Sequence, residues 1–527
     1  MPVAHTEVAV LIVGAGPVGL TARALLERWG VRVLLVEKHG GLSPFPRARL
    51  VNMRSMEIYR QLGLAAEITG NAFPPEYGRV RFRDTLHDRD FATAAMVGVN
   101  APVPESPVIG VVTSQDRLEP TLLAAADAHV RFGVELIGLT EEADSLVASL
   151  VDHQRGGKTS VRARYVLAAD GANSTVRQLL GIDTTGPGAM GGFTTILFDA
   201  DLNRWCARQP AGVYFTAHGL FAPLYPERGW AWSLPTPEDA THADWPELLS
   251  RALGQSGDVR ADALRVEHWV MNAFVAERFR HGRILLAGDA AHAIPIIGGL
   301  GMNAGIADVH NLCWKLAGVL HGWAEPSLLD TYEAERQPVA HQTLREAVAN
   351  TRLMLQVQDR RREQRRMSDV TPADVELPWS DRYFAQLGLV LGVTYRSHAV
   401  LTDAPPEPSE TATDYVPTAE PGRRMPHLWL TSDRSTLDAF GEWFTLLAPD
   451  PTYWAQRTPA PWPLRVEALP GEHTDLCGLR PGGALLIRPD GHIGARWRDR
   501  PPSDATLRHA LIAMTCPTQS PSPTGSR

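Results

Sequence analysis

The chain has 527 residues, 44% of them hydrophobic and 21% charged, which is typical of a globular protein with two or three domains. Acidic residues outnumber basic ones, 59 to 51, which argues against a nucleic-acid-binding protein. No stretch reaches the roughly 18 apolar residues of a membrane span, and no basic leader begins the chain, so we expect a cytoplasmic protein without a membrane segment.

The cysteines and the one basic run argue against two other kinds of site. The arginine-rich run at 360–366 lies among acidic residues of a helical stretch, which indicates a solvated helix face. The cysteines lack Cys-x-x-Cys spacing, so we expect free thiols, no redox pair and no metal site. They are Cys206, Cys313, Cys477 and Cys516.

The first predicted element is a buried parallel strand over residues 8–13, followed at once by a glycine motif. Gly14 permits a tight turn, Gly16 lets a pyrophosphate approach the backbone, and Gly19 lets the following helix pack closely on the strand. Pro17 suits the first turn of that helix, whose N-terminus faces the phosphate charge. This pattern predicts a dinucleotide-binding βαβ unit.

A second apolar strand, 31–36, ends in Glu37, which stands roughly 20 residues beyond the glycines. A carboxylate at this point accepts a hydrogen bond from a ribose 2′-hydroxyl. Lys38 follows it and is included among the candidate cofactor contacts. The alternative is a tight glycine turn in an α/β core without a ligand.

A third apolar strand, 165–169, is broken by Asp170-Gly171 and followed by a polar segment that includes Arg177. A carboxylate at the C-terminal end of a parallel strand lies where α/β sheets bind their ligands. An isolated Asp-Gly pair is usually a turn. Together with the glycine motif, it indicates a ligand-binding edge.

Residues 186–191 also fit the spacing Gly-x-Gly-x-x-Gly, but their context is different. They follow the polar residues 183–185 rather than an apolar strand, and they precede 193–198, which we predict to be a strand rather than a helix. We therefore expect a loop here, and a single dinucleotide-binding fold in the whole chain.

The segment from 193 to about 270 is rich in aromatic and alternating stretches and is predicted to be mostly β-sheet. Its aromatic side chains are candidates for lining an apolar pocket that takes a planar substrate. The alternative for each of them is packing in the core of the sheet. These candidates are Tyr214, Phe221, Tyr225, Trp230 and Trp232.

The strand at 283–287 ends in Gly288-Asp289, and a glycine-rich loop follows it at 295–302. The Asp289 carboxylate is placed to accept hydrogen bonds from a ribityl or ribose hydroxyl. An amphipathic helix then begins at about Asn303 and runs to about 320, with its N-terminal amides turned toward the glycine loop. These amides would stabilise negative charge on a bound reduced flavin.

Beyond 353 the chain is charged and helical, and then rich in Pro, Glu and Thr from 404 to 421. We predict a third domain of alternating strands and helix, followed by a disordered tail. The predicted domains are 1–180 with 271–352, 181–270, a helical segment and linker at 353–421, 422–515, and the tail 516–527.

Taken together, the motifs resemble the FAD-dependent aromatic hydroxylases, a family of single-component flavoprotein monooxygenases. The family includes para-hydroxybenzoate hydroxylase, phenol hydroxylase and the polyketide hydroxylases, and the resemblance extends over nearly the whole chain. The resemblance implies a Rossmann-like FAD-binding domain, an inserted substrate-covering β-sheet, and a thioredoxin-like C-terminal domain without redox cysteines that serves structure or contact in a homodimer. The matching stretches are 8–37, 46–48, 114–119, 170–177, 288–306 and 308–316.

The resemblance also implies roles for individual residues. Glu37 would contact the adenosine ribose, Arg47 and Gln115 the region of the pyrophosphate and ribityl chain, and Asp289 the ribityl and phosphate side. Asp170 with Arg177 would serve both FAD and a passing nicotinamide cofactor. Along the pyrimidine edge of the flavin would lie Gly301, Met302 and Asn303, with Gly288 and Pro295 in the adjoining turns. The residues Ile296 and Ile297 are bulkier than the family's usual choice, so the pocket near the flavin should differ in shape.

The chemistry that the resemblance implies is reduction of FAD by NAD(P)H, addition of O2 to give a flavin C4a-hydroperoxide, and transfer of oxygen to an aromatic carbon. The long three-domain form resembles enzymes that act on polycyclic polyketides. No catalytic base is evident from the sequence. His292 is a candidate by position only, and structural packing is the alternative.

Three alternatives remain open at this point. The same fold can run Baeyer–Villiger insertion or plain oxidation, and a non-catalytic protein could shelter FAD and a substrate. The run 230–235 is also close to the Trp-x-Trp-x-Ile-Pro signature of flavin-dependent halogenases. Those enzymes use a tunnel lysine, and none of Lys38, Lys158 and Lys315 is well placed for that role.

Overall fold

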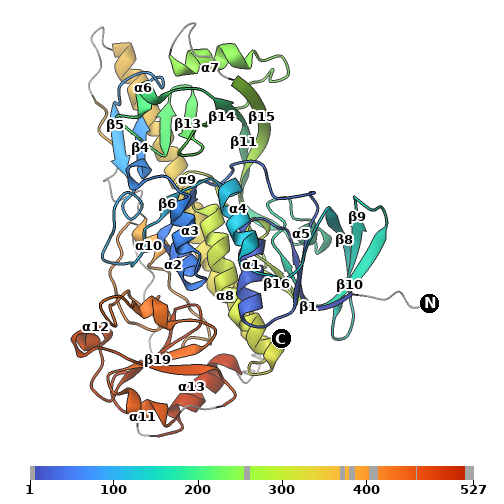
Figure 1. Cartoon of the computed structure of the whole chain (residues 1–527), viewed down its shortest axis with the longest axis vertical. Helices are drawn as coiled ribbons and strands as arrows, with labels where there is room; N and C mark the ends of the chain where they lie inside the picture. Colours follow the sequence, from blue (N-terminus) through green and yellow to red (C-terminus); the bar gives the residue numbers. More distant parts are fainter. Residues whose placement is uncertain are drawn as a thin grey trace, which may run out of the picture.

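The computed structural model describes residues 6–254, 262–367, 374–378, 386–402, 413–457, 460–501 and 503–516. Figure 1 shows a central layered part that carries both β1 and α1, a second sheet above it, and a C-terminal part below it. The α/β fold class with an additional β-sheet, predicted from the sequence, is confirmed.

The central sheet is built from the apolar runs that the sequence predicts as buried strands. Its order is β16-β17-β10-β1-β2-β7, and all neighbours except β16 and β17 pair in parallel. A hairpin of β8 and β9 lies beside β10. The bounds are β1 Thr6–Val13, β2 Val33–Glu37, β7 Val130–Phe132, β8 Val134–Glu141, β9 Leu146–Asp152, β10 Lys158–Ala168, β16 Arg280–His281 and β17 Ile284–Leu286.

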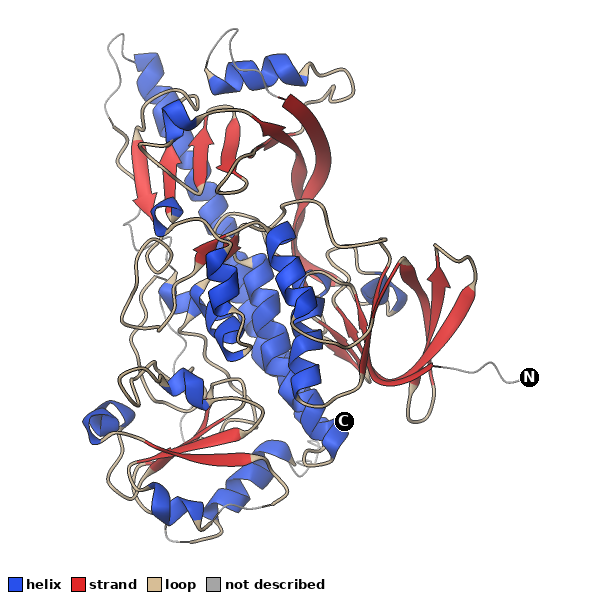
Figure 2. Cartoon of the chain, viewed as in Figure 1, coloured by secondary structure: helices blue, strands red, loops and turns tan. Residues whose placement is uncertain are grey.

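Helices pack side by side against this sheet, as Figure 2 shows in blue. Helix α8 begins two residues before the predicted start and lies against α1. The helices of this part are α1 Pro17–Arg28, α2 Met53–Gln61, α3 Ala65–Gly70, α4 Gln115–Ala124, α5 Thr175–Leu179 and α8 Gly301–His321, with the short helices η1 Pro75–Tyr77, η2 Gly288–Ala290 and η3 Pro326–Leu329.

The register of the central sheet brings the three sequence motifs to one edge. Val13 pairs with Val36 on one side and with Ala168 on the other, and Ala168 pairs with Leu286. The glycine motif, Asp170 and Gly288 each follow one of these strand ends. Because the strands are parallel, the motifs share the C-terminal edge, where sheets of this kind bind ligands.

The second sheet has the order β18-β15-β11-β14-β13-β12-β4-β5. It takes β4 and β5 from residues 79–95 and β18 from 292–293, so it extends beyond the predicted limits of 181–270. The bounds are β4 Arg79–Phe82, β5 Ala92–Ala95, β11 Thr184–Asp199, β12 Val213–Thr216, β13 Gly219–Pro223, β14 Trp230–Pro235, β15 Asp262–Ala276 and β18 His292–Ala293. Two short helices, α6 Asn203–Cys206 and α7 Trp245–Leu253, cover one face, and a separate pair of short strands is formed by β3 Leu50–Val51 and β6 Val111–Val112.

The predicted loop at 186–191 is wrong, because this run belongs to strand β11. β11 pairs with β15 along its length, with register shifts between Thr185 and Gly188 and between Ala189 and Gly192. Gly186, Gly188 and Gly191 take positive φ values, which glycine adopts readily at bulges. The glycines therefore bend a long strand, and no helix follows them as a nucleotide-binding turn requires.

Helix α9, Asp330–Met367, runs from the central part up to the second sheet, as Figure 1 shows. Its residues 353–367 account for the start of the predicted helical segment, and α10, Leu387–Val390, is the next helix of the described residues. Residues 403–412 of the predicted linker and 517–527 of the predicted tail lie outside the described residues. None of the described helices is both long enough and apolar enough to cross a membrane.

The C-terminal part has a four-stranded sheet of order β20-β19-β21-β22, in which β19 and β20 are parallel and the other pairs antiparallel. Helices separate the first three strands, and one follows the last. Its thioredoxin-like assignment stays a prediction. The bounds are η5 Thr436–Ala439, β19 Phe444–Ala448, α11 Pro451–Ala455, β20 Leu464–Ala468, η6 Gly471–His473, α12 Thr474–Cys477, β21 Ala484–Ile487, β22 Ile493–Trp497 and α13 Thr506–Thr515.

Candidate functional site

The three glycines of the first motif have different surroundings, and the difference defines a ligand position. A Cβ on Gly14 would lie 2.3 Å from the Ala169 carbonyl oxygen, and one on Gly19 would lie 1.9 Å from the Gly14 carbonyl oxygen. Both glycines are therefore required for close packing of the chain. A Cβ on Gly16 would meet nothing within 4 Å. The backbone at Gly16 is thus open on the side where the motif predicts a pyrophosphate.

The N-terminus of α1 is available to an anion. Gly16 is its N-cap residue and has no side chain to cap the first amides, and Pro17 occupies the first turn without an acid beside it. Glu37 lies close by, since its Oε2 accepts a hydrogen bond from the Ala15 amide at 2.8 Å and its Oε1 one from the His39 amide at 2.9 Å. Lys38 is exposed next to it. The carboxylate is thus held at the strand end with lone pairs left for hydroxyl donors.

Gln115 holds the segment that carries Arg47 against the start of α4. Its side-chain oxygen accepts a hydrogen bond from the Ala48 backbone amide at 3.2 Å, and its backbone amide donates to the Ala48 carbonyl at 2.8 Å. The Gln115 Nε2 donates to Glu119 at 2.7 Å. Gln115 is therefore engaged within the protein, and its predicted proximity to the cofactor would act through the placement of Arg47.

Arg47 is exposed and interacts electrostatically with the carboxylates of Glu119, Glu267 and Asp289. Burial raises the pKa of Glu119, and Arg47 acts against that rise. Its guanidinium is thus placed between the Asp289 turn and the second sheet, which suits an arginine that neutralises a phosphate.

Asp170 and Arg177 lie together at the end of β10, but each is bound mainly within the protein. The Asp170 Oδ2 accepts a hydrogen bond from the Val176 amide at 3.1 Å, while its buried Oδ1 has no hydrogen-bond partner among the described residues. Arg177 donates to the carbonyls of Ala290 and Ala172 at 2.8 and 2.7 Å. Burial raises the pKa of Asp170, so this carboxylate has an unused acceptor in a desolvated position.

Asp289 lies on a short helical turn that faces the N-terminus of α8. A Cβ on Gly301 would lie 3.9 Å from its Oδ1. The side chain is exposed, yet the protein around it displaces water and raises the pKa of Asp289, while His292 and Arg47 act in the opposite direction. The Asp289 carboxylate is thus accessible and has protein atoms close around it, as suits a ribityl-binding acid.

The start of α8 is uncapped, because Leu300 provides no side-chain hydrogen bond and the first turn carries no acid. Gly301 and Met302 are partly exposed there, while Pro295 is buried. Asn303 is buried, and its side chain makes four hydrogen bonds within the protein, at 2.7 to 2.9 Å. Asn303 therefore fixes the loop around the helix start, and the free amides of this turn are the groups that would face a flavin.

The residues fit an FAD molecule by their local geometry. One open glycine backbone lies at the uncapped N-terminus of α1, an acid stands at the end of β2, and a second, accessible acid lies beside the uncapped N-terminus of α8. All of these groups lie at the C-terminal edge of one parallel sheet. Amides of α1 for the pyrophosphate, one hydroxyl-accepting carboxylate on either side of them, and the amides of α8 at the flavin end match the charge and hydroxyl pattern of that cofactor.

His292 is not placed as a catalytic base. Its side chain has no exposed surface, and its Nε2 lies 2.6 Å from the Asp308 Oδ2 in the core. Its ring also packs near Phe279, with ring centroids 5.9 Å apart. The structure therefore places the candidate away from the accessible part of the site, and the packing interpretation accounts for it.

Four of the five aromatic substrate candidates lie on the closed face of the second sheet. Tyr214, Phe221, Trp230 and Trp232 are at most 7% exposed and form one core with residues of α6 and α7. Phe221 and Trp232 stack with centroids 5.8 Å apart. Tyr225 lies apart from them in the β13–β14 turn, where its hydroxyl donates to Asp116 and Arg117 covers its ring. The predicted pocket lining is thus corrected to core packing for these four.

On the opposite face of the sheet, β14 carries small and polar side chains. Side chains alternate along a strand, so Ala231 and Ser233 point away from Trp230 and Trp232. Ser233 Oγ lies 2.9 Å from Thr195 Oγ1, which accepts a hydrogen bond from Trp269 Nε1 at 3.0 Å. The sequence analysis missed these residues. The signal was present in the alternation of large and small residues in β14.

This polar face, defined by Thr195, Ser233, Glu267 and Trp269, is joined to the cofactor loops at two places. Arg265 of β15 lies 3.7 Å over the ring of Phe45, two residues before Arg47. At the other end, Phe215 of β12 and Ile297 of the glycine loop pack against the same apolar cluster. The polar face of the sheet thus spans the region above the predicted flavin position.

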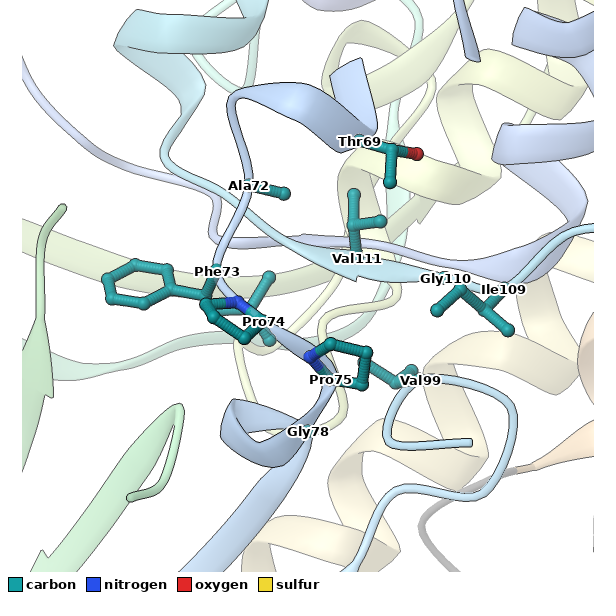
Figure 3. Close-up of a pocket in the computed structure, with 11 residues that line it drawn as sticks. Thr69, Ala72, Phe73, Pro74, Pro75, Gly78, Val99, Ile109, Gly110 and Val111 are labelled. Atoms are coloured by element: carbon teal, nitrogen blue, oxygen red, sulfur yellow. The ribbon is translucent and has the colours of Figure 1, made fainter. Parts of the chain in front are cut away.

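A cavity of about 150 Å³ lies elsewhere. Figure 3 shows its lining residues, with the Phe73–Pro75 segment on one side, the strand that carries Val111 on another, and Val99 next to Pro75. Its lining includes none of the predicted site residues. This apolar cavity is therefore separate from the cofactor groups described above.

Comparison with known proteins gives matches over almost the whole chain. A family model described as an FAD binding domain matches residues 7–347, and one described as aromatic-ring hydroxylase, C-terminal, matches residues 418–516. Aklavinone 12-hydroxylase DnrF of Streptomyces peucetius is 37% identical over 494 residues, which cover 88% of this chain and 95% of that protein. Tetracenomycin B2 monooxygenase-dioxygenase of Streptomyces olivaceus is 34% identical over 556 residues, which cover 94% and 96%.

Solved structures match equally far. The flavin-dependent monooxygenase PieE, in complex with FAD and substrate, has a TM-score of 0.88 and 32% identity, with 97% of this chain and 100% of that chain covered. Aklavinone-11 hydroxylase in a ternary complex with FAD and aklavinone has a TM-score of 0.82 and 33% identity, with 97% and 99% covered.

Proposed function

This chain belongs to the family of FAD-dependent aromatic-ring hydroxylases and is an FAD-dependent monooxygenase, and we propose that its substrate is a polycyclic aromatic compound of polyketide type. We further propose that NAD(P)H is the reductant and that the enzyme works in the cytoplasm. The four cysteines, none of them in a disulfide, support that location.

The observation that carries the proposal is the position of the polar face of the second sheet relative to the cofactor groups. Arg265 over Phe45 and the shared cluster of Phe215 and Ile297 hold this face above the glycine loop. A flat substrate between the sheet and the loop would meet Ser233, Thr195 and Trp269. Relatives named for aklavinone and tetracenomycin support a polycyclic substrate.

FAD, when bound and reduced, would activate O2, of which one atom enters the substrate and the other leaves as water. The chain supplies position and charge. The uncapped N-terminus of α8 favours negative charge at the flavin end of the cofactor, and Arg47, near Asp289, neutralises phosphate charge. The sheet above excludes water from the reacting atoms, which prevents loss of the oxidising equivalent as H2O2.

The proposed reductant would approach without a nucleotide-binding domain of its own. The second Gly-x-Gly-x-x-Gly run lies in strand β11 and is not followed by a helix. Asp170, which is partly exposed, and the nearby Arg177 are the candidate contacts for a nicotinamide cofactor that docks in passing.

The test is NAD(P)H oxidation by the purified holoenzyme against a panel of phenols and polycyclic quinones, with H2O2 and product mass recorded together. A polycyclic compound should stimulate oxidation, gain the mass of one oxygen atom, and give little H2O2. Product structure then separates a ring hydroxyl from a lactone, the Baeyer–Villiger outcome. Oxidation without oxygen gain would indicate an oxidase, and stimulation only by single-ring phenols would refute the polycyclic substrate.

A further inference from the structure

One buried carboxylate holds both ends of the turn that carries Asp289. The Asp308 Oδ2 accepts a hydrogen bond from the Gly288 amide at 3.1 Å and lies 2.6 Å from the His292 Nε2. Asp308 has no exposed surface and lies two turns into α8. The residues before and after Asp289 are thus tied to a single side chain, and the orientation of the Asp289 carboxylate depends on it.

The turn has little freedom to adjust if this tie is broken. Gly288 has a φ of +60°, and a Cβ there would lie 2.9 Å from a methyl group of Val18 on α1. A Cβ on Gly305 of α8 would lie 2.8 Å from the Gly288 Cα. The turn is packed tightly between α1 and α8. If the hydrogen bond to Asp308 is lost, the Gly288 amide therefore either stays buried without a partner or reaches water only when the helices move apart.

Arg336 of α9 keeps the Asp308 carboxylate charged in this core. Its Nε donates to the Asp308 Oδ1 at 2.7 Å, and its Nη2 donates to the Ala304 carbonyl at 3.1 Å. Burial by itself would raise the pKa of Asp308, but His292 and Arg336 lower it to about 2. A charged acceptor makes stronger hydrogen bonds to the turn than a neutral one would.

The same arginine is connected to the C-terminal domain. Its Nη1 lies 3.2 Å from the Tyr395 hydroxyl, and the Tyr395 ring stacks on His492 with centroids 4.0 Å apart. The Tyr395 amide also donates to the Gly422 carbonyl at 2.8 Å. The neighbouring Glu335 accepts two hydrogen bonds from Arg488, which follows strand β21 of that domain, at 2.6 and 2.8 Å.

We propose that Asp308 and Arg336 are positioning residues of the FAD site and that they couple this site to the C-terminal domain through Tyr395. This inference rests on the placement of FAD along Asp289 in the proposed function. The C-terminal domain thereby contributes to cofactor retention although it lies on the far side of α8. By thermodynamic linkage, FAD binding stabilises the contact with the C-terminal domain by the same factor.

The test compares FAD binding with folding in the same variants. Apoprotein is titrated with FAD, flavin fluorescence gives the Kd, and circular dichroism gives the Tm of the apoprotein. Asp308→Asn keeps the shape but loses the charge, and we expect its Kd to rise at least about tenfold. Asp90→Asn is the matched control, because Asp90 also binds two arginines but lies in the β4–β5 connection, away from the turn.

The control should lower the Tm while its Kd stays within twofold of the wild type. An Asp308→Asn protein that folds and binds FAD within twofold of the wild type would overturn the proposal. A rise of equal size in the control would overturn it too, because the effect would then follow stability alone. If the wild-type apoprotein does not bind FAD at all, the proposed function fails first, and that outcome is distinguishable from the others.

Two further variants complete the test. Arg336→Lys keeps a positive charge but cannot reach both Asp308 and the Ala304 carbonyl, so it carries the test if Asp308→Asn does not fold. Tyr395→Phe removes only the hydroxyl and keeps the ring on His492. Its Kd should rise about two- to tenfold. A Kd equal to that of the wild type would refute the coupling to the C-terminal domain.

Discussion

The open backbone at Gly16 makes a direct prediction for Gly16→Ala. Gly16 has a φ of −75° and a ψ of 179°, which alanine adopts without strain, and its added Cβ would meet no protein atom within 4 Å. Alanine is a poorer N-cap than glycine by up to about 1 kcal/mol, and it loses less entropy on folding by a similar amount. The free energy of unfolding of the apoprotein should therefore change by less than about 1 kcal/mol.

The effect on FAD should be much larger. The new methyl group would occupy the space through which a pyrophosphate reaches the amides of α1, so at least one charge-assisted hydrogen bond would be lost. Such a bond contributes about 1.5–3 kcal/mol, which corresponds to a roughly 10- to 150-fold rise in the FAD Kd. Fluorescence titration of apoprotein with FAD measures the Kd, and urea unfolding measures stability.

The control is Gly70→Ala, at the last residue of α3, where an added Cβ also meets nothing within 4 Å and no site group is near. It should change neither quantity appreciably. A Gly16→Ala protein that binds FAD within twofold of the wild type would refute the placement of the pyrophosphate. A large loss of stability in Gly16→Ala would refute the argument that this position is open.

Three other outcomes follow from the same structure. Gly19→Ala places a Cβ 1.9 Å from the Gly14 carbonyl oxygen, so urea unfolding of the apoprotein should show a loss on the order of 3 kcal/mol, and unchanged stability would contradict the packing described. Ser233→Leu should fill space on the polar face and lower kcat/KM for the substrate at least about tenfold while the FAD Kd stays constant, in line with the cost of a misplaced substrate; equal kcat/KM would remove this face from the site. The pKa of Asp308 is lowered from its ordinary value of 3.8 to about 2, which corresponds to about 2 kcal/mol of folding stability. This stability is present above pH 3.8 and is lost as the pH falls through about 2. Urea midpoints measured from pH 4 to pH 2 should therefore fall more steeply in the wild type than in Asp308→Asn, and parallel slopes would contradict the assignment.

The cofactor half of the site could be predicted from the sequence because its signals are local. An apolar run followed by glycines and, roughly 20 residues later, an acid contains the strand, the turn and the helix start in one stretch. The structure pairs Val13 with Val36 and Ala168 as these runs imply. Parallel pairing then brings Asp170 and Gly288 to the same edge, so three distant motifs indicated one site.

The substrate half of the site could not be predicted, because the alternation of side chains along a strand does not show which face of the sheet is buried. In β14 the pattern of large and small residues shows that two faces exist, but it does not say which face is covered by helices. Helices α6 and α7 cover the face of Trp230 and Trp232, so the aromatics became core and Ser233 became accessible. The same limit applies to the glycines at 186–191, since pairing with β15 turned a motif-like run into a bulged strand.

The supporting groups of the site were decided only by tertiary structure. Asp308 and Arg336 stand 28 residues apart on two helices, and Tyr395 lies a further 59 residues on. No local pattern links them, because their contact is made when α8, α9 and the C-terminal domain pack together. The sequence by itself determined the ligand-binding edge and the family, whose signals are short and periodic. The packing of layers decided which side chains reach the ligand and which hold the site in place, since burial is a property of the whole fold.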